Sequence, residues 1–361
     1  MNKQINVVSL FSGIGGFEEG LKLANINSKI VLASEIDSFA KKSYIANFGD
    51  ENLHGDIKLV DEKDVPDHTL LLAGFPCQSF SIAGKRKGFE DIRGTLFFEV
   101  ARILSEKKPK YILLENVKNL ISHDGTATIR TILNTLNEIG YSVDFTVLNS
   151  SEAGVPQNRD RTYICGIYNG KIEKYLPDNR SVKADKLKKE LNETDFKGFN
   201  FFDGVSFKNK QKCIEDILQE DVDATFFFDT EKISEYLDDV DVDEDIVRQT
   251  RIIKIIDLPR EVHNDLERQR RVYSVKGISP TVLARADSTK ILVTDSGKKK
   301  IRKITPVENF YIQGFSKEFV CNIRNTGMSA TQMYKQSGNA VSPPVIAGIL
   351  EKMYKEYMAN D

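Results

Sequence analysis

The main candidate for a nucleophile in this chain is a cysteine directly after a predicted buried strand. Residues 69–73 (TLLLA) form a short apolar run, which is typical of a buried parallel strand, and the segment 74–78 (GFPCQ) follows it. Ligands of open α/β sheets bind beyond the carboxyl ends of the strands, so Cys77 stands where we expect a site. Pro76 restricts the turn that presents the thiol. Most lone cysteines are small buried hydrophobic residues, so other motifs must support a nucleophilic role.

Two more polar motifs lie at the ends of predicted strands. Glu115 follows the apolar strand 111–114 (YILL), where a carboxyl group should have a raised pKa and hold a proton. A helix-capping or salt-bridged acid is the alternative. Arg159 and Arg161 are one residue apart directly before another strand, so both should point the same way and could clamp a carboxylate or a base carbonyl. As a surface basic pair they would carry no function.

A glycine-rich turn, residues 11–17 (FSGIGGF), follows the first predicted strand and can bring the backbone close to a ligand at a helix N-terminus. A dinucleotide fingerprint would need a third glycine where the chain has Glu18, which disfavours NAD. Glu35 ends the second strand about 20 residues later and can accept from both hydroxyls of a ribose. Asp56 and Ile57 could bind an adenine amine and wall its ring. This order favours an adenosyl ligand without phosphates, of which S-adenosylmethionine is the common one.

Alternating strands and helices position these motifs. Strands are predicted at 5–11, 29–35, 70–75, 111–115, 143–148 and 162–167, and helices at 15–24, 37–47, 96–105 and 125–139. The alternation predicts a doubly wound, mostly parallel α/β sheet. Between about 170 and 300 it is lost, and charged segments around a phenylalanine cluster, residues 226–228, predict a second, smaller irregular domain. We therefore expect one domain over 1–175 and 330–361, and a second with a hinge over 176–329.

Composition limits the class of protein. The length of 361 residues suits two domains. The sequence has no run of 18 or more apolar residues, so no membrane span is expected. The first residues lack the apolar core of a signal peptide. Four scattered cysteines argue against disulfides or zinc and favour the reducing cytoplasm. The net charge of −2 hides eleven acidic residues against one basic residue over 221–245, and twelve basic against five acidic residues over 260–303. The basic stretch is compatible with a phosphate-facing surface, and equally with a solvated face.

The order of the motifs resembles that of the DNA (cytosine-5) methyltransferases, most closely the small bacterial restriction-modification members. Seven segments carry the resemblance: 11–16 (FSGIGG), 74–78 (GFPCQ), 94–99 (GTLFFE), 115–117 (ENV), 157–161 (QNRDR), 312–315 (IQGF) and 334–341 (YKQSGNAV). They span nearly the whole chain and are interrupted mainly between about 175 and 265. Each motif alone is modest, but seven in the family's order are specific.

The resemblance implies an enzyme that methylates C5 of a flipped-out cytosine in a specific duplex DNA site, protecting DNA in a restriction-modification system. Cys77 would add to C6 of the ring, because covalent addition turns C5 into a nucleophile. Glu115 would hold or protonate N3 and contact the exocyclic amine. Arg161 would hold the base carbonyl and support Glu115, with Arg159 alongside.

The resemblance also implies S-adenosyl-L-methionine as methyl donor, S-adenosyl-L-homocysteine as product, and no metal. Phe11 would stack on the adenine, Glu35 would bind the ribose and Asp56 the adenine amine. The remaining implied cofactor residues line the turn, the ring or the methionine part: Gly13, Gly15, Gly16, Ile36, Ile57, Leu96 and Asn339.

Double-stranded DNA is the implied partner, and the first domain would be catalytic while the second recognises the target. A mobile loop, residues 81–93, would close over the flipped base. Residues 263–270 would enter the major groove, and Arg268 or Gln269 would fill the vacated stack. The implied DNA-contacting residues are Ser81, Lys85, Arg86, Arg268, Gln269, Arg271, Tyr273 and Thr281.

Some features depart from the family's pattern, and alternatives stay open. Ser9 stands where the family usually has aspartate, and Ile36 replaces a frequent aromatic residue. An RNA (tRNA) cytosine-5 methyltransferase would share the catalytic residues, and a non-catalytic DNA-binding regulator would share the fold. A cysteine hydrolase is disfavoured because no histidine falls in a recognisable base motif. We expect a cytoplasmic monomer whose companion restriction endonuclease, if one exists, acts separately.

Overall fold

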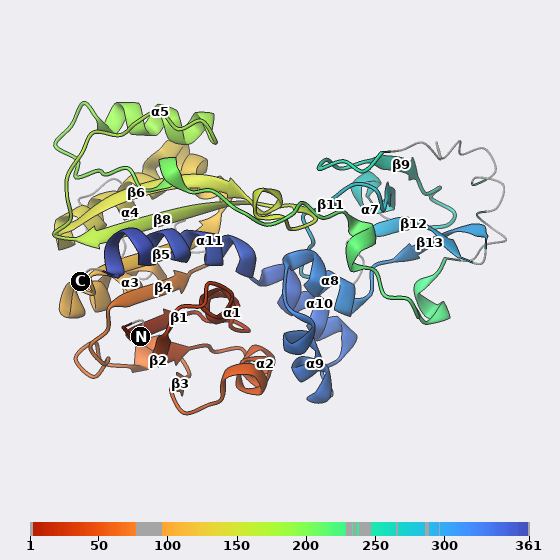
Figure 1. Ribbon diagram of the computed structural model, residues 1–361, viewed down its shortest axis with the longest axis horizontal. Coiled ribbons are helices and arrows are strands. Elements are labelled where there is room, and N and C mark those ends of the chain that lie inside the picture. Colours follow the sequence, from red (N-terminus) through yellow and green to blue (C-terminus); the bar gives the residue numbers. More distant parts are fainter. Residues whose placement is uncertain are drawn as a thin grey trace. The chain divides into compact units, whose positions relative to one another are not determined.

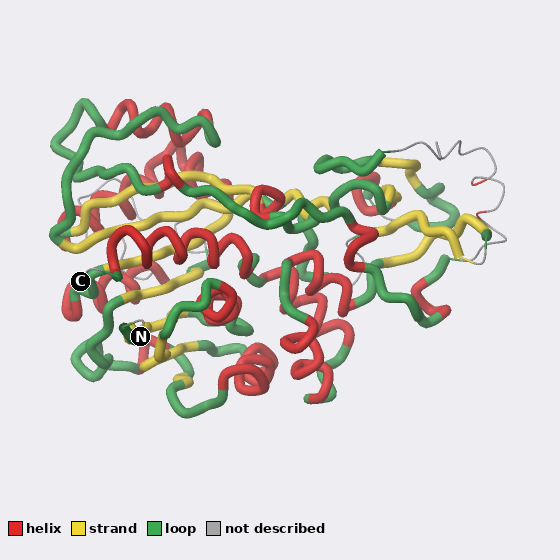
Figure 2. Tube along the Cα trace, in the orientation of Figure 1, coloured by secondary structure: helices red, strands yellow, loops and turns green. Residues whose placement is uncertain are grey.

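The computed structural model describes residues 3–76, 96–228, 233, 237, 247–264, 266–285, 289–295 and 297–359. The chain divides into two compact units (Figures 1 and 2). Unit 1 comprises Met1–Leu148, Asp160–Ser206 and Ile346–Asp361, and unit 2 comprises Asn149–Arg159 and Phe207–Val345. None of the helices in the described part of the chain has the length and apolarity needed to cross a bilayer.

Unit 1 is built on a seven-stranded sheet of order β3-β2-β1-β4-β5-β8-β6. Its strands are β1 (Ile5–Leu10), β2 (Ser28–Ser34), β3 (Leu53–His54), β4 (Leu70–Gly74), β5 (Tyr111–Val117), β6 (Tyr141–Asn149) and β8 (Asp160–Tyr168). The strands from β3 to β5 pair in parallel, whereas β8 pairs with β5 antiparallel. β4 and the apolar part of β5 are fully buried, as their continuous apolar sequence predicts. The predicted doubly wound, mostly parallel fold is confirmed.

The helices of unit 1 follow the strands in the predicted alternation. They are α1 (Gly16–Leu23), α2 (Ser38–Phe48), α3 (Leu96–Lys107), α4 (Ala127–Ile139) and α5 (Val182–Leu191), with the short helices η1 (Ile57–Leu59), η3 (Lys118–Thr126) and η5 (Phe202–Gly204). Asp37 begins α2 by accepting hydrogen bonds from the backbone of Phe39 and Ala40. α4 packs on the core through an apolar stripe that includes Ile129 and Leu133. α5 lies outside the predicted alternation.

The last residues of the chain belong to unit 1. α11 (Pro343–Met353) begins with two prolines, which a first helical turn tolerates, and is followed by a π-helical turn (Tyr354–Met358). The Tyr111 hydroxyl of β5 donates to the Tyr357 carbonyl at 2.9 Å. The terminal segment is therefore bonded directly to a central strand of the sheet.

Unit 2 contains a four-stranded sheet of order β13-β12-β10-β9, where the sequence predicts only irregular structure. Its strands are β9 (Lys254–Asp257), β10 (Arg271–Ser274), β12 (Lys290–Asp295) and β13 (Lys298–Lys303), and β7 (Gln157–Asn158) pairs with β11 (Ser279–Pro280). The helices are α7 (Glu267–Arg270), α8 (Pro306–Gln313), α9 (Lys317–Asn325) and α10 (Ala330–Asn339), with η4 (Ser150–Ala153), η6 (Ile214–Ile217) and η7 (Ala224–Phe226). Thr305 and Glu308 form a capping box that begins α8.

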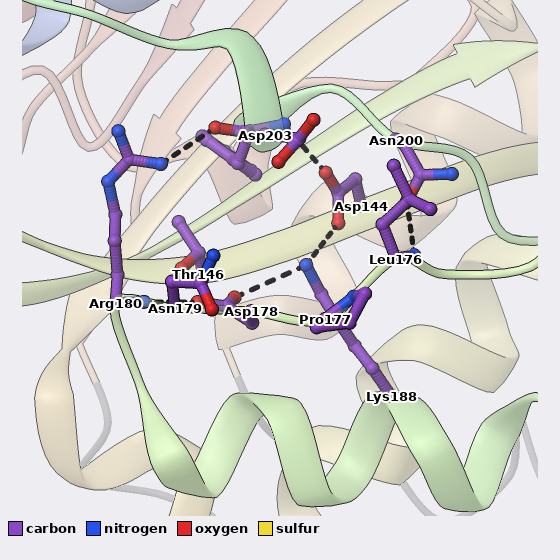
Figure 3. Close-up of a pocket in the computed structure, with 11 residues that line it drawn as sticks. Asp144, Thr146, Leu176, Pro177, Asp178, Asn179, Arg180, Lys188, Asn200 and Asp203 are labelled. Carbon is purple, nitrogen blue, oxygen red and sulfur yellow. Dashed lines mark hydrogen bonds and ion pairs between the residues drawn. The ribbon is translucent and has the colours of Figure 1, made fainter.

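A polar cavity of about 300 Å³ lies in unit 1 beside β6 and α5, and no predicted site residue lines it (Figure 3). Lys188 points from α5 between two carboxylates: its Nζ lies 2.8 Å from Asp144 Oδ1 and 3.2 Å from Asp178 Oδ2. Asp144 also accepts from the backbone N–H groups of Phe201 and Phe202. These side chains are almost fully buried, so the charges fix the segment around the cavity to the sheet edge.

Replacement of Lys188 by methionine should lower the free energy of unfolding by about 3–5 kcal/mol, because it leaves two buried carboxylates without their cation. The neighbouring Lys189 is the matched control, since its side chain is 67% exposed where it pairs with Asp185. Lys189→Met should cost less than about 1 kcal/mol. Urea unfolding of both variants measures the difference, and equal losses would contradict the assigned role of the buried cluster.

Glu18 is a buried carboxyl group beneath the first strand-to-helix turn. It lies in the first turn of α1 with 3% of its surface exposed, and the Tyr44 hydroxyl of α2 donates to its Oε1 at 3.3 Å. Burial raises the pKa of Glu18 to about 7. The folded protein therefore binds a proton at Glu18 over a pH range in which the unfolded chain has already released it.

This pKa shift should make stability fall as the pH rises from about 5 to about 7, because the folded state holds the extra proton only at the lower end. Glu18→Gln cannot release a proton, so it should remove this contribution. The stability of the variant relative to the natural protein should rise by about 1.4 kcal/mol per pH unit across that range. Urea unfolding at half-unit pH intervals gives both curves, and parallel curves would show that Glu18 does not titrate there.

Candidate active site

Glu115 and Arg161 meet across the antiparallel strands β5 and β8 of the unit 1 sheet. β5 and β8 pair Val117 with Arg161 and Glu115 with Tyr163, so residues 115 and 161 project from the same face, two positions apart. The Nε of Arg161 lies 3.2 Å from Oε1 of Glu115, and their side chains are 17% and 11% exposed. The contact that the resemblance implies between these two residues is present.

The strand that leads to Cys77 ends beside this ion pair. Gly74 of β4 pairs with Glu115, and a side chain added at Gly74 would lie 3.6 Å from Glu115 Oε2. Asn116 donates its side-chain amide to the carbonyl of Phe75 at 2.7 Å, and the Phe75 ring is buried against Phe97 with 5.4 Å between ring centroids. The chain is thus fixed as it approaches the thiol. Cys77 itself lies outside the described residues.

Asn116 is a site residue that the sequence reasoning did not single out. Its position in the 115–117 motif, next to the predicted acid, was the available signal. The amide of Asn116 anchors the segment before Cys77, whereas Glu115 faces the other strand. The two neighbours therefore do different work because successive residues of a strand point to opposite faces.

Arg159 does not share the partners of Arg161. Its guanidinium is buried, and its Nη2 donates to the carbonyls of Gly338 and Ala340 at 3.0 and 2.8 Å. Arg161 bonds Glu115 and the carbonyl of Asp160. The two arginines were expected to point the same way, but β7 ends at residue 158 and β8 begins at residue 160, so strand alternation does not hold across them.

A buried polar network in unit 2 continues from Arg159 around the end of α10. The Gln157 amide donates to Gln313 Oε1 at 2.8 Å, and the Gln313 amide donates to the Ser337 carbonyl at 2.6 Å. Gly338 packs so closely that an added side chain would lie 2.4 Å from the backbone of Leu283. Asn339, the last residue of α10, is exposed at the end of this network, and its predicted contact with the cofactor stays a prediction.

The glycine-rich turn of unit 1 is tightly built. Gly13 and Gly15 have φ angles of 56° and 92°, and a side chain at Gly15 would lie 2.2 Å from the Phe48 ring. Gly16 is the first residue of α1. Phe11 also has a positive φ, 55°, which is uncommon for a residue with a side chain and costs free energy. Such strain is typical of sites where the backbone must adopt one shape.

Glu35 fastens this turn to the end of β2. Its Oε2 accepts from the Gly13 backbone N–H at 2.8 Å, and its Oε1 accepts from Asp37 N–H at 2.7 Å. Each carboxylate oxygen can accept a second hydrogen bond, so the hydroxyls of a ribose can still bind. Ile36 is 73% exposed beside it, which suits a side chain that covers a flat ring.

The other predicted cofactor residues have mixed exposure. The Glu35 N–H donates to the carbonyl of His54, so the segment that follows β3 runs beside the end of β2. Asp56 accepts from the Lys58 N–H, while Ile57 is buried. Leu96 is half-buried at the start of α3. These residues of unit 1 thus fit an adenosyl group. The part of the chain that the structure describes contains no cluster of three or more metal-ligating side chains.

Most of the predicted DNA-contacting residues are either outside the described part or engaged within unit 2. Ser81, Lys85 and Arg86 lie outside the described residues, as does the side chain of Arg268. The Nε of Arg271 lies 3.7 Å from Oδ1 of Asp257. Tyr273 is buried in β10, and the Thr281 hydroxyl donates to the carbonyl of Asn158. Tyr273 and Thr281 thus have contacts inside the unit, and their role in DNA binding stays a prediction.

Comparison with known proteins identifies the family. The family described as C-5 cytosine-specific DNA methylase matches residues 5–355. The chain is 41% identical to the type II methyltransferase M1.ScrFI of Lactococcus lactis subsp. cremoris, over 96% of this chain and 77% of the relative. It is 37% identical to the type II methyltransferase M.SsoII of Shigella sonnei, over 98% of this chain and 80% of the relative.

A solved structure shares the fold at low sequence identity. The Dnmt2 methyltransferase of S. pombe superposes with a TM-score of 0.68, covering 97% of this chain and 98% of that one, at 19% identity. This likeness bears on the fold, and the sequence relatives bear on the family. The chain therefore belongs to the C-5 cytosine-specific DNA methylases, the S-adenosylmethionine-dependent family that its seven motifs predict.

Proposed function

We propose that this protein transfers a methyl group from S-adenosyl-L-methionine to C5 of a flipped-out cytosine in one specific duplex DNA sequence. The Glu115–Arg161 ion pair beside the segment that leads to Cys77 is the observation that carries the proposal. The relatives at 37–41% identity are named as type II methyltransferases, which supports a role in protecting DNA in a restriction-modification system.

The proposed reaction uses the thiolate of Cys77 as nucleophile. C5 of cytosine is a poor nucleophile, so the thiolate adds to C6 while Glu115 donates a proton to N3, which leaves an enamine that is nucleophilic at C5. When bound, S-adenosylmethionine supplies the methyl group on a sulfonium. Loss of the C5 proton to a base and elimination of the Cys77 thiolate then restore the aromatic ring and release the enzyme.

Glu115 and Arg161 are proposed to bind the base together. Arg161 holds the Glu115 carboxyl group in place and directs a further N–H toward the base carbonyl. Both side chains are largely buried, which strengthens their electrostatic effect on the developing charge. For Arg159, its contacts with the Gly338 and Ala340 carbonyls support a positioning role in place of the catalytic role implied by the resemblance.

The turn and the ends of β2 and β3 are proposed to bind the cofactor, with Glu35 at the ribose and Asp56 at the adenine amine. Phe11 and Ile36 would stack on the ring, where exposed Ile36 supplies less contact than the family's frequent aromatic residue. The chemistry requires no metal, and the product is S-adenosyl-L-homocysteine. The remaining proposed cofactor residues are Gly13, Gly15, Gly16, Ile57, Leu96 and Asn339.

The proposed partner is double-stranded DNA, bound by a monomer in the cytoplasm. A target base inside the helix must leave the stack before Cys77 can reach C6. We propose that the region 176–329 recognises the target and that residues 1–175 and 330–361 carry the reaction. A companion endonuclease would act separately on unmethylated copies of the same sequence.

A covalent adduct tests the proposed nucleophile. Bisulfite sequencing of DNA from cells that express the protein first gives the methylated sequence. A duplex with 5-fluorocytosine at that position and S-adenosylmethionine should then form a conjugate with the protein that resists denaturation, because fluorine blocks the release of Cys77. Cys77→Ser should form none. Transfer of labelled methyl to tRNA and not to any duplex would contradict the DNA assignment.

The two arginines should respond differently to the same conservative change. Arg161→Lys should slow adduct formation by about 100-fold, because it removes a fixed donor at the base, while leaving the melting temperature nearly unchanged. Arg159→Lys should instead lower the free energy of unfolding by about 2 kcal/mol through its lost hydrogen bonds to buried carbonyls. Adduct kinetics and thermal melts of both variants measure this contrast, and the reverse pattern would place Arg159 at the base.

A further inference from the structure

A lysine is buried at the start of β12. Lys290 is 1% exposed, its Nζ donates to the backbone carbonyl of Gln269 at 2.6 Å, and its ammonium lies 5.8 Å from the centroid of the Phe228 ring. Lysine is almost never fully buried, because removing its charge from water is costly. A buried ammonium that points at a backbone carbonyl must therefore fix that carbonyl strongly.

The carbonyl that Lys290 binds belongs to α7. β10 and β12 pair Val272 with Lys290, so the lysine lies beside the second residue after α7, and its side chain extends back to that helix. The next residue of the same turn, Arg270, is held by Leu258, whose N–H donates to the Arg270 carbonyl at 2.8 Å and whose carbonyl accepts from Arg270 Nη1 at 2.6 Å. Lys290 thus completes the attachment of α7 to the four-stranded sheet.

The phenylalanine cluster supplies the other face of this site. Phe228 donates its backbone N–H to the Ile301 carbonyl at 3.0 Å, and Phe227 forms an antiparallel bridge with Arg302. Because its backbone is fixed to β13, the Phe228 ring forms a floor for the Lys290 ammonium, an arrangement that stabilises a cation away from water. The cluster had no role in the sequence analysis, and these contacts give it one.

We propose that Lys290 is a positioning residue for DNA sequence recognition: it fixes α7 so that Gln269 and its neighbours meet the correct base pair. The inference rests on the proposed function, in which residues 263–270 enter the major groove. Gln269 as a residue is half-buried, so the lysine fixes by its backbone carbonyl a residue that keeps part of its surface accessible to a base edge. Lys290 itself is buried and does not touch DNA.

The test compares methylation of the recognised duplex with methylation of duplexes that differ from it at one base pair. Lys290→Met keeps the length and apolar stem of the side chain but removes the donor. It should lower the ratio of kcat/KM between the recognised and altered sites by about 10-fold or more. Lys290→Arg keeps a cationic donor and should restore most of the ratio. Phe228→Leu keeps the apolar contact and should lower the ratio less than Lys290→Met does.

Lys300→Met is the matched control. Lys300 lies on the adjacent strand over the ring of Phe227 and pairs with Asp295. It is thus also a lysine next to a phenylalanine ring, but its contacts among the described residues are with residues outside α7. The ratio of kcat/KM between the recognised and altered sites should be the same for Lys300→Met as for the natural protein. Thermal melts of all variants separate loss of folding from loss of discrimination.

Three results are informative. A lower ratio in Lys290→Met alone, restored by arginine, supports the proposal. An unchanged ratio with active enzyme, or an equal loss in Lys300→Met, overturns it and leaves the proposed function intact. If the natural protein methylates no duplex at all, the proposed function fails and this inference fails with it.

Discussion

The ion pair between Glu115 and Arg161 depends on a single reversal in an otherwise parallel sheet. A parallel neighbour of β5 would bring its carboxyl end to the mouth of the sheet, whereas antiparallel β8 brings its beginning there. The chain can therefore place an arginine that opens one strand against an acid that ends another. Their partial burial makes the pair rigid, and the backbone before Cys77 is anchored beside it by Asn116.

In the glycine-rich turn, as at the ion pair, a few residues make several contacts each. One carboxylate, Glu35, accepts hydrogen bonds from the backbone of two segments, and it is also the proposed ribose ligand. The strained φ of Phe11 is maintained because these hydrogen bonds and the packing of Gly15 on Phe48 leave the turn little alternative. Binding and folding requirements coincide in these few residues.

The sequence predicts the alternating half of unit 1 well because each of its elements follows one simple rule. β1 is a mostly apolar run and β4 a continuous one, and their observed bounds lie within one residue of the predicted ones. The same reasoning misses the unit 2 sheet, whose β13 has the sequence KKKIRK and shows no apolar run. It also predicts the wrong direction for the Arg159 side chain, because the spacing of residues does not reveal that one strand ends at residue 158 and the next begins at residue 160. The burial of Lys290 is the hardest feature to predict from sequence, because a lysine at the start of a strand is expected to face solvent.

Neither unit is continuous along the chain: the backbone passes between them after residues 148, 159, 206 and 345. Within unit 1, the hydroxyl of Tyr111 in β5 donates to the carbonyl of Tyr357, which is 246 positions further along the chain. Contacts between residues so distant along the chain are slow to form, because the entropy of closing the intervening loop is lost before the contacts stabilise the fold. Until such contacts form, apolar surface of the sheet stays exposed, and the partly folded chain is prone to aggregate.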